Sequence, residues 1–158
     1  MDAASRAPAS FVAASPTRIL DTRSDAGLAG PFVSGVAEQL QVTGVVATRP
    51  PNNAPQVDVE VVPSGASSAV FTVRVVRPLT NGFLSVRSDD ATGFSATLNI
   101  NWTAGGADIA NSVTVQLPAS GKVDIFVNGT VGEVLIDVAG YNVAASTGPA
   151  GGSGEPDQ

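Results

Sequence analysis

Three charged residues near the N-terminal end of the chain, Arg18, Asp21 and Arg23, could together form a polar binding site. On an extended strand Asp21 and Arg23 share a face, whereas Arg18 lies on the other face unless the chain bends. Such a cluster could bind a carboxylate or a carbohydrate. The alternative is structural: Asp21 caps the following turn and pairs with an arginine that fixes this segment to the fold. We favour the structural role, because breaking a buried ion pair costs about 3–5 kcal/mol.

The single tryptophan and the single tyrosine, Trp102 and Tyr141, are the second candidate for ligand contact. Either ring could stack on a sugar. The alternative is that Trp102 ends a strand at the edge of the core and that Tyr141 closes the last strand. We favour packing for both and keep the two residues as candidate ligand contacts.

The chain contains no histidine and no cysteine, which removes the side chains that most often act as general base or zinc ligand. A serine nucleophile would have no histidine to activate it. No glycine-rich loop precedes a Lys-Ser or Lys-Thr pair, so no phosphate-binding loop is indicated. Glu38, Glu60 and Glu133 lie in or beside expected strands, where a solvent-facing position explains them. We expect no catalytic residues and no enzymatic activity.

Several aspartates could supply oxygen ligands for calcium, but none has the spacing of a known calcium loop. Aspartate is also common in turns for conformational reasons. We therefore expect no metal site and no cofactor. The aspartates considered are Asp21, Asp25, Asp89, Asp90 and Asp108.

The formal net charge is −6, and the eight basic residues are scattered singly along the chain. Nucleic-acid binding needs clustered lysine and arginine, so we expect no nucleic-acid partner. No run approaches the ~20 apolar residues of a membrane span, and we expect no membrane insertion. The first residues lack the basic and apolar regions of a secretory signal. Either a signal has been removed, or the protein is made without export, as virion components are.

Apolar and polar residues alternate in many short runs, which is typical of half-buried antiparallel strands. Asn128-Gly129, between two such runs, predicts a tight hairpin. Strands at roughly ten-residue spacing favour an all-β antiparallel sandwich, jelly-roll-like, with eight or nine strands. The expected strands span 36–46, 57–62, 69–77, 83–87, 95–101, 112–117, 122–128 and 133–138, after an extended segment at 16–23.

Composition divides the chain into three parts. Residues 1–10 are small and polar and are expected to form an N-terminal arm, and residues 11–143 form the β-sandwich domain. Residues 144–158 carry no large apolar side chain, which predicts a flexible Gly/Pro-rich tail.

Two motifs carry a resemblance to a known family. The opening Arg18-Ile19-Leu20-Asp21-Thr22-Arg23 and the closing Asp137-Val138-Ala139-Gly140-Tyr141 resemble the "RhhDTR…DhxGY" β-rich domains (h, apolar) of actinobacterial and acidobacterial secreted surface proteins and of actinophage structural proteins. The family usually has Asn and Thr where this chain has Thr72 and Arg74. Further similar segments are 69–71, 73–78, 82–86, 95–99 and 110–113. The resemblance implies a β-rich architecture and a surface setting, and it implies no mechanism.

Together these features predict a non-catalytic structural or adhesive module located in a virion or on the cell surface. We slightly favour a capsid-decorating or tail-associated virion protein, acting as a homo-oligomer or on a virion or cell-surface protein. The alternative is a secreted actinobacterial module that binds cell wall or glycan, with a polysaccharide as its partner.

Overall fold

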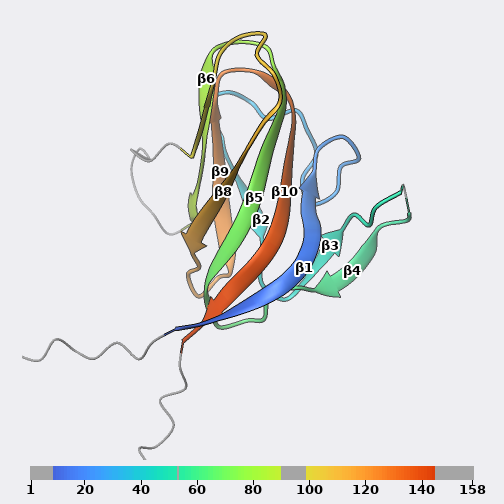
Figure 1. Ribbon diagram of the computed structural model, residues 1–158, viewed down its shortest axis with the longest axis vertical. Coiled ribbons are helices and arrows are strands. Elements are labelled where there is room, and N and C mark those ends of the chain that lie inside the picture. The colour runs from blue at the N-terminus through green and yellow to red at the C-terminus, as the bar shows by residue number, and fades with distance from the viewer. Residues whose placement is uncertain (1–8, 53, 90–98, 145–158) are drawn as a thin grey trace, which may run out of the picture.

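The computed structural model describes residues 9–52, 54–89 and 99–144, and these form ten β-strands and no helix (Figure 1). The all-β sandwich fold predicted from the sequence is confirmed, although the strands described outnumber the eight or nine expected. They are β1 (Ser10–Asp21), β2 (Ala37–Gln41), β3 (Val45–Thr48), β4 (Val57–Glu60), β5 (Ala66–Pro78), β6 (Gly82–Ser88), β7 (Ile100–Trp102), β8 (Ile109–Gln116), β9 (Lys122–Asn128) and β10 (Val131–Val143).

Two four-stranded antiparallel sheets make up the sandwich, with strand orders β1-β10-β5-β8 and β2-β9-β6-β7. Strands that come early in the chain pair with later strands in reverse order. β1 pairs with β10, β2 with β9, β5 with β8, and β6 with β7. The chain therefore resembles one long antiparallel ribbon folded over into two layers.

A small third sheet, β3 with β4, projects from one side of the sandwich (Figure 1). The single strand expected at 36–46 is wrong, because β2 ends at Gln41 and β3 begins at Val45. Between them Val42 and Thr43 both donate a backbone hydrogen bond to the carbonyl of Gly121, and Gly44 has φ of 79°. These hydrogen bonds and the turn at Gly44 direct the chain away from β2. The hydrophobic pattern of the sequence gives no sign of this change of direction.

The predicted hairpin at Asn128-Gly129 is also wrong, because β9 and β10 belong to different sheets. Gly129 does provide a turn, with φ of 109°. However, the carbonyl of Thr130 accepts hydrogen bonds from the backbone N–H groups of Leu79 and Thr80, and Val131 pairs with Pro78. Pairing with β5, distant in sequence, thus prevails over the local turn, and the chain crosses from one sheet to the other.

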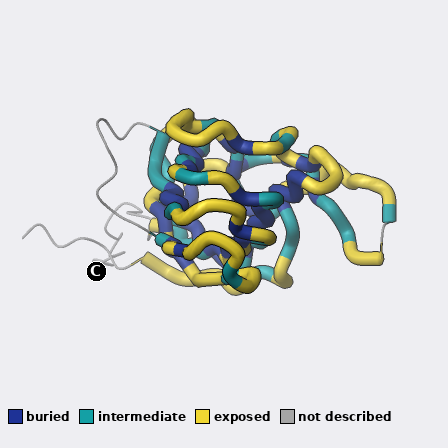
Figure 2. Tube along the Cα trace, turned by 90° about the horizontal axis from the view of Figure 1, so that it is seen from above, coloured by how far each residue is buried: buried dark blue, intermediate teal, exposed yellow. Residues whose placement is uncertain are grey.

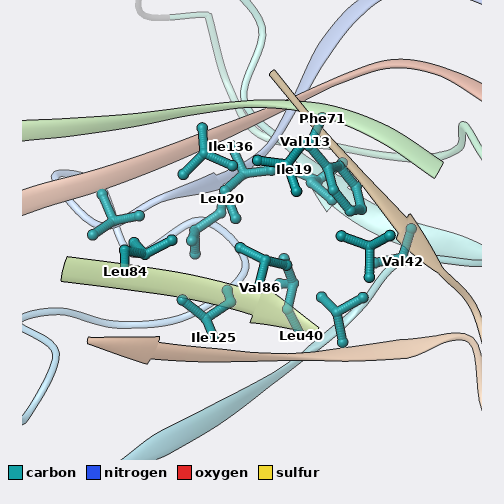
Figure 3. Close-up of a cluster of buried hydrophobic side chains, with 14 of the residues drawn as sticks. Ile19, Leu20, Leu40, Val42, Phe71, Leu84, Val86, Val113, Ile125 and Ile136 are labelled. Carbon is teal, nitrogen blue, oxygen red and sulfur yellow. The ribbon is translucent and has the colours of Figure 1, made fainter. Parts of the chain in front are cut away.

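The core lies between the two sheets, and buried positions alternate with more exposed ones along much of β5 and β8 (Figure 2). Figure 3 shows Phe71 and Ile136 of the first sheet facing Leu84, Val86 and Ile125 of the second. Phe71 is completely buried and is among the largest of the fully buried side chains. The period-two pattern predicted from the sequence thus places the apolar face of most runs in a single core. The run at 57–62 is an exception, because Val57 and Val59 on β4 are exposed.

Other predicted segments coincide only in part with the described strands. Of the extended segment expected at 16–23, residues 16–21 belong to the longer strand β1, which begins at Ser10, whereas residues 22 and 23 lie in the turn that follows Asp21. Of the strand expected at 95–101, Ile100 and Asn101 lie in β7, whereas 95–98 lie outside the described residues. Most of the expected arm and tail, residues 1–8 and 145–158, also lie outside them.

One buried acid, Asp124 on β9, leads to a prediction about stability. Burial raises the pKa of its carboxyl group, and Arg87, with Nε 3.9 Å from Oδ2, only partly opposes this. Oδ1 accepts no hydrogen bond from the described residues. Because the folded pKa is raised, this group favours folding below its unfolded pKa of about 3.9, and that contribution is lost as pH rises through the folded pKa.

We therefore expect Asp124→Asn to raise the free energy of unfolding at pH 7 by about 1 kcal/mol. The gain should disappear in acid, where Asp124 is neutral in both states. Urea unfolding at pH 7 and at pH 3, followed by the fluorescence of Trp102, measures both values. The exposed Asp58→Asn is the control and should change neither, and a destabilised Asp124→Asn at pH 7 would contradict the argument.

Candidate functional site

The structure brings Arg18, Asp21 and Arg23 together at the end of β1. The guanidinium of Arg23 donates two hydrogen bonds to the Asp21 carboxylate, from Nε to Oδ1 at 2.9 Å and from Nη2 to Oδ2 at 2.8 Å. The Arg23 backbone N–H also donates to Oδ1 at 3.1 Å, so Asp21 caps the turn that follows β1. Asp21 is 3% exposed. The hydrogen bond from the Arg23 guanidinium lowers the pKa of Asp21, and burial opposes this shift.

Arg18 reaches the same carboxylate because β1 contains the bend that the sequence argument required. Arg18 pairs with Asp137 and Leu20 with Ile136, so Ile19 is the extra residue of a β-bulge. The bulge shifts the alternation by one residue and brings Nη1 of Arg18 to 3.6 Å from Oδ2 of Asp21.

Arg18 also joins the opening motif of the chain to the closing one. Its Nε and Nη2 donate to the two carboxylate oxygens of Asp137 on β10, at 2.8 and 3.2 Å. Asp137 was missed as a partner of the cluster, although it is the first residue of the closing motif. Two motifs far apart in sequence thus meet on neighbouring strands.

Thr22 provides a second connection to β10. Its hydroxyl donates to Oε2 of Glu133 at 2.6 Å and accepts from the backbone N–H of Val134 at 3.0 Å. Thr22 is buried, and its own N–H donates to the carbonyl of Val134. The segment Asp21-Thr22-Arg23 is therefore held to the first sheet by side-chain and backbone contacts.

One pocket, of about 410 Å³, lies beside Trp102, and another, of about 370 Å³, opens over the charged cluster. The second, which we call the arginine pocket, is lined on one side by Arg18, Asp21, Arg23 and Ser24. The loop Arg49-Pro50-Pro51-Asn52, which leaves β3, lines the other side. Its lining is mostly polar.

Arg49 is the residue of this pocket that sequence reasoning missed. The two prolines of Arg49-Pro50-Pro51 indicate that the preceding strand ends there, but nothing in this local sequence indicates proximity to Arg18. In the structure the Arg49 N–H donates to the Arg18 carbonyl at 2.9 Å. Within the described residues its guanidinium has no hydrogen-bond or ion-pair partner, whereas Arg18 and Arg23 each bind a carboxylate. Arg49 therefore leaves one positive charge uncompensated at the pocket.

Trp102 and Tyr141 do not form a common site. Trp102 pairs with Gly82 at one end of the second sheet, and Tyr141 pairs with Val12 and Ala69 at the other end of the first. Trp102 is 7% exposed and lines the 410 Å³ pocket with its neighbours Asn101 and Thr103. Tyr141 is partly buried and packs against the core.

Two of the other aspartates, Asp108 and Asp89, take part in local contacts. Asp108 accepts hydrogen bonds from the backbone N–H of Arg77 and from the Arg74 guanidinium, which lower its pKa. Asp89 accepts from the Ser120 hydroxyl at 2.8 Å, and Asp90 lies outside the described residues. No group of three potential metal ligands comes together in the part of the chain that the structure describes. Nor do those residues contain a helix able to span a membrane.

Comparisons with protein-family models, with curated proteins and with solved structures find no match to this chain.

Proposed function

We propose that this protein is a non-catalytic structural module that assembles with copies of itself on a virion or cell surface. The observation that carries the proposal is the outer edge of β8. Within the described residues no strand pairs with this edge. An unprotected edge strand offers a row of backbone donors and acceptors to another chain.

The other edge strands each carry a feature that hinders pairing. β1 contains Pro16 and two register shifts, and β4 carries Asp58 and Glu60. β2 has five residues, including Glu38, whereas β3 has only four and β7 only three. β8, in contrast, has eight residues, Ile109-Ala-Asn-Ser-Val-Thr-Val-Gln116, with neither charge nor proline. Among the described edges it alone lacks the protection that natural edge strands usually have.

The hydrogen bonds of β8 indicate which part of the edge is open. The N–H of Ser112 points away from β5 and donates a hydrogen bond to the side-chain oxygen Oδ1 of Asn111 at 2.9 Å. By the alternation of an antiparallel ladder, the N–H groups of Thr114 and Gln116 point the same way. They have no acceptor among the described residues. A two-fold pair centred on Thr114 would set Thr114 against Thr114 and Ser112 against Gln116, without like-charge repulsion.

The order of the strands supports the same proposal. We assign the eight main strands to a jelly roll, in which paired strands fold over into two sheets, with β3–β4 as an insertion. Jelly rolls recur in viral capsid proteins and in lectins. This is a fold-level association, because one fold serves many functions. A weak edge contact suits a virion surface, since many copies held close together strengthen it through high effective concentration.

The alternative function is a secreted cell-wall or glycan-binding module. The observation that favours it is the arginine pocket, whose polar lining and uncompensated charge suit a ligand more than a packing contact. A binding screen against peptidoglycan and polysaccharides, beside one against phage shells and tails, separates the two functions.

The substitution Thr114→Lys tests the assembly directly. Two lysines opposed across a two-fold pair repel, so we expect the apparent dissociation constant to rise by about tenfold or more, which corresponds to about 1.4 kcal/mol. Sedimentation velocity over rising concentration measures the shift from the 15.8 kDa chain to its oligomer. Thr114 is exposed, so the melting temperature should change little.

The matched control is Thr72→Lys, which adds the same charge on the neighbouring central strand β5. Thr72 is exposed but does not lie on the edge, and we expect oligomerisation close to that of the wild type. A wild-type protein that stays monomeric at millimolar concentration, or equal effects of the two lysines, would overturn assembly through β8.

A further inference from the structure

We propose that the arginine pocket binds the carboxylate of a uronic-acid sugar, with Arg49 as its principal anion-binding residue. This inference does not depend on assembly through β8. It rests on the position of one guanidinium, on the way its neighbours are fixed, and on the polarity of the remaining lining.

The charges at the pocket favour a ligand that places one carboxylate there. The carboxylates of Asp137 and Asp21 are bound by Arg18 and Arg23 respectively, whereas Arg49 has no such partner among the described residues. A carboxylate would neutralise the single remaining positive charge, and a guanidinium can bind it through two parallel hydrogen bonds. The whole chain has a net charge of −6, so this attraction is local to the pocket.

The pocket is also held in shape before any ligand arrives. Arg49 is anchored by its backbone hydrogen bond to Arg18, and the two prolines that follow restrict the backbone of the loop. Arg18 and Arg23 are each held by two hydrogen bonds to a carboxylate. The lining around the Arg49 side chain is therefore largely fixed, and a site with a fixed lining loses less conformational entropy on binding.

The remaining lining favours a sugar over a peptide. Ser24 and Asn52 border the pocket and supply a hydroxyl and an amide suited to sugar hydroxyl groups. The pocket offers little apolar surface for the side chains of a peptide. A peptide could not extend the sheet by pairing with the Arg18 carbonyl either, because the Arg49 N–H already occupies it.

Isothermal titration with trigalacturonic acid tests the inference, and its methyl ester is the neutral comparison. We expect the acid to bind, the ester to bind at least about tenfold more weakly, and Arg49→Gln to weaken binding of the acid by a similar factor, as expected for loss of a charge-assisted pair. Arg74→Gln removes an arginine outside the pocket and should leave binding unchanged. Using Thr114→Lys as the parent protein separates this result from assembly.

Three outcomes would overturn the inference. The acid could fail to bind, or Arg49→Gln could bind it as tightly as the parent. In the third outcome, a triglutamate peptide binds as tightly as the uronate, which would assign the pocket to acidic peptides. Circular dichroism of Arg49→Gln checks that the fold persists, which we expect because the Arg49 backbone contact does not need the side chain.

Discussion

Asp21→Ala is expected to lower the free energy of unfolding by about 3 kcal/mol, at the lower end of the cost of breaking a buried ion pair. Asp21 is almost fully buried, and its loss would leave Arg23 without its carboxylate and the turn after β1 without its cap. The estimate is at the lower end because Arg18 and Arg23 remain partly exposed and can be solvated.

The effect of Asp21 should depend on pH with a definite sign. The arginine contacts lower the pKa of Asp21 in the folded state. Its contribution to stability is therefore complete above the unfolded pKa of about 3.9 and is lost as pH falls through the folded value. The destabilisation by Asp21→Ala should thus shrink in acid. Asp124, whose pKa is raised by burial, has the opposite dependence.

Thermal melting at pH 7 and at pH 2.5 measures this effect, with the exposed Asp58→Ala as control. We expect Asp21→Ala to lower the melting temperature while uronate binding persists, since Arg49 remains. Unchanged melting together with lost binding would reverse the roles and make Asp21 primarily a ligand-binding residue.

Phe71→Ala is expected to have the largest effect of all, a loss of about 4 kcal/mol of unfolding free energy. Phe71 lies at the centre of β5 and is completely buried between the two sheets (Figure 3). Its removal leaves a cavity that rigid sheets on both sides cannot easily close.

Phe83→Ala is the matched control, because it deletes the same side chain from a partly exposed position. Phe83 contacts Phe126, with ring centroids 6.1 Å apart, and we expect a loss of about 1 kcal/mol for this pair. Urea unfolding of both variants gives the two values. Equal losses would contradict the assignment of Phe71 to the centre of the core.

The fold class could be predicted because burial alternates along individual strands. The runs around Phe71 and Val113 indicate both their strands and their inward faces without any knowledge of neighbours. Pairing could not be predicted in the same way. Asn128-Gly129 favours a hairpin locally, but the hydrogen bonds of Thr130 and the pairing of Val131 with β5 decide the crossing.

In the candidate site, too, contacts between residues close in sequence could be predicted, whereas contacts that depend on strand pairing could not. Asp21 and Arg23 are partners, as the sequence predicts, but not by sharing one face of an extended strand. Arg23 lies in the turn after β1, and Asp21 caps that turn. The participation of Asp137 and Arg49 depends on strand pairing and on a loop after β3, which only the three-dimensional structure provides. The bulge at Ile19, which lets Arg18 reach Asp21, likewise arises from the register with β10.

The central claim is that copies of this chain pair through the outer edge of β8, and amide hydrogen exchange at that edge tests it most directly. The backbone N–H groups of Thr114 and Gln116 should exchange more slowly as protein concentration rises from micromolar to millimolar, while exposed amides of β4 should not change. Equal exchange rates for Thr114 and Gln116 at all concentrations would contradict the claim.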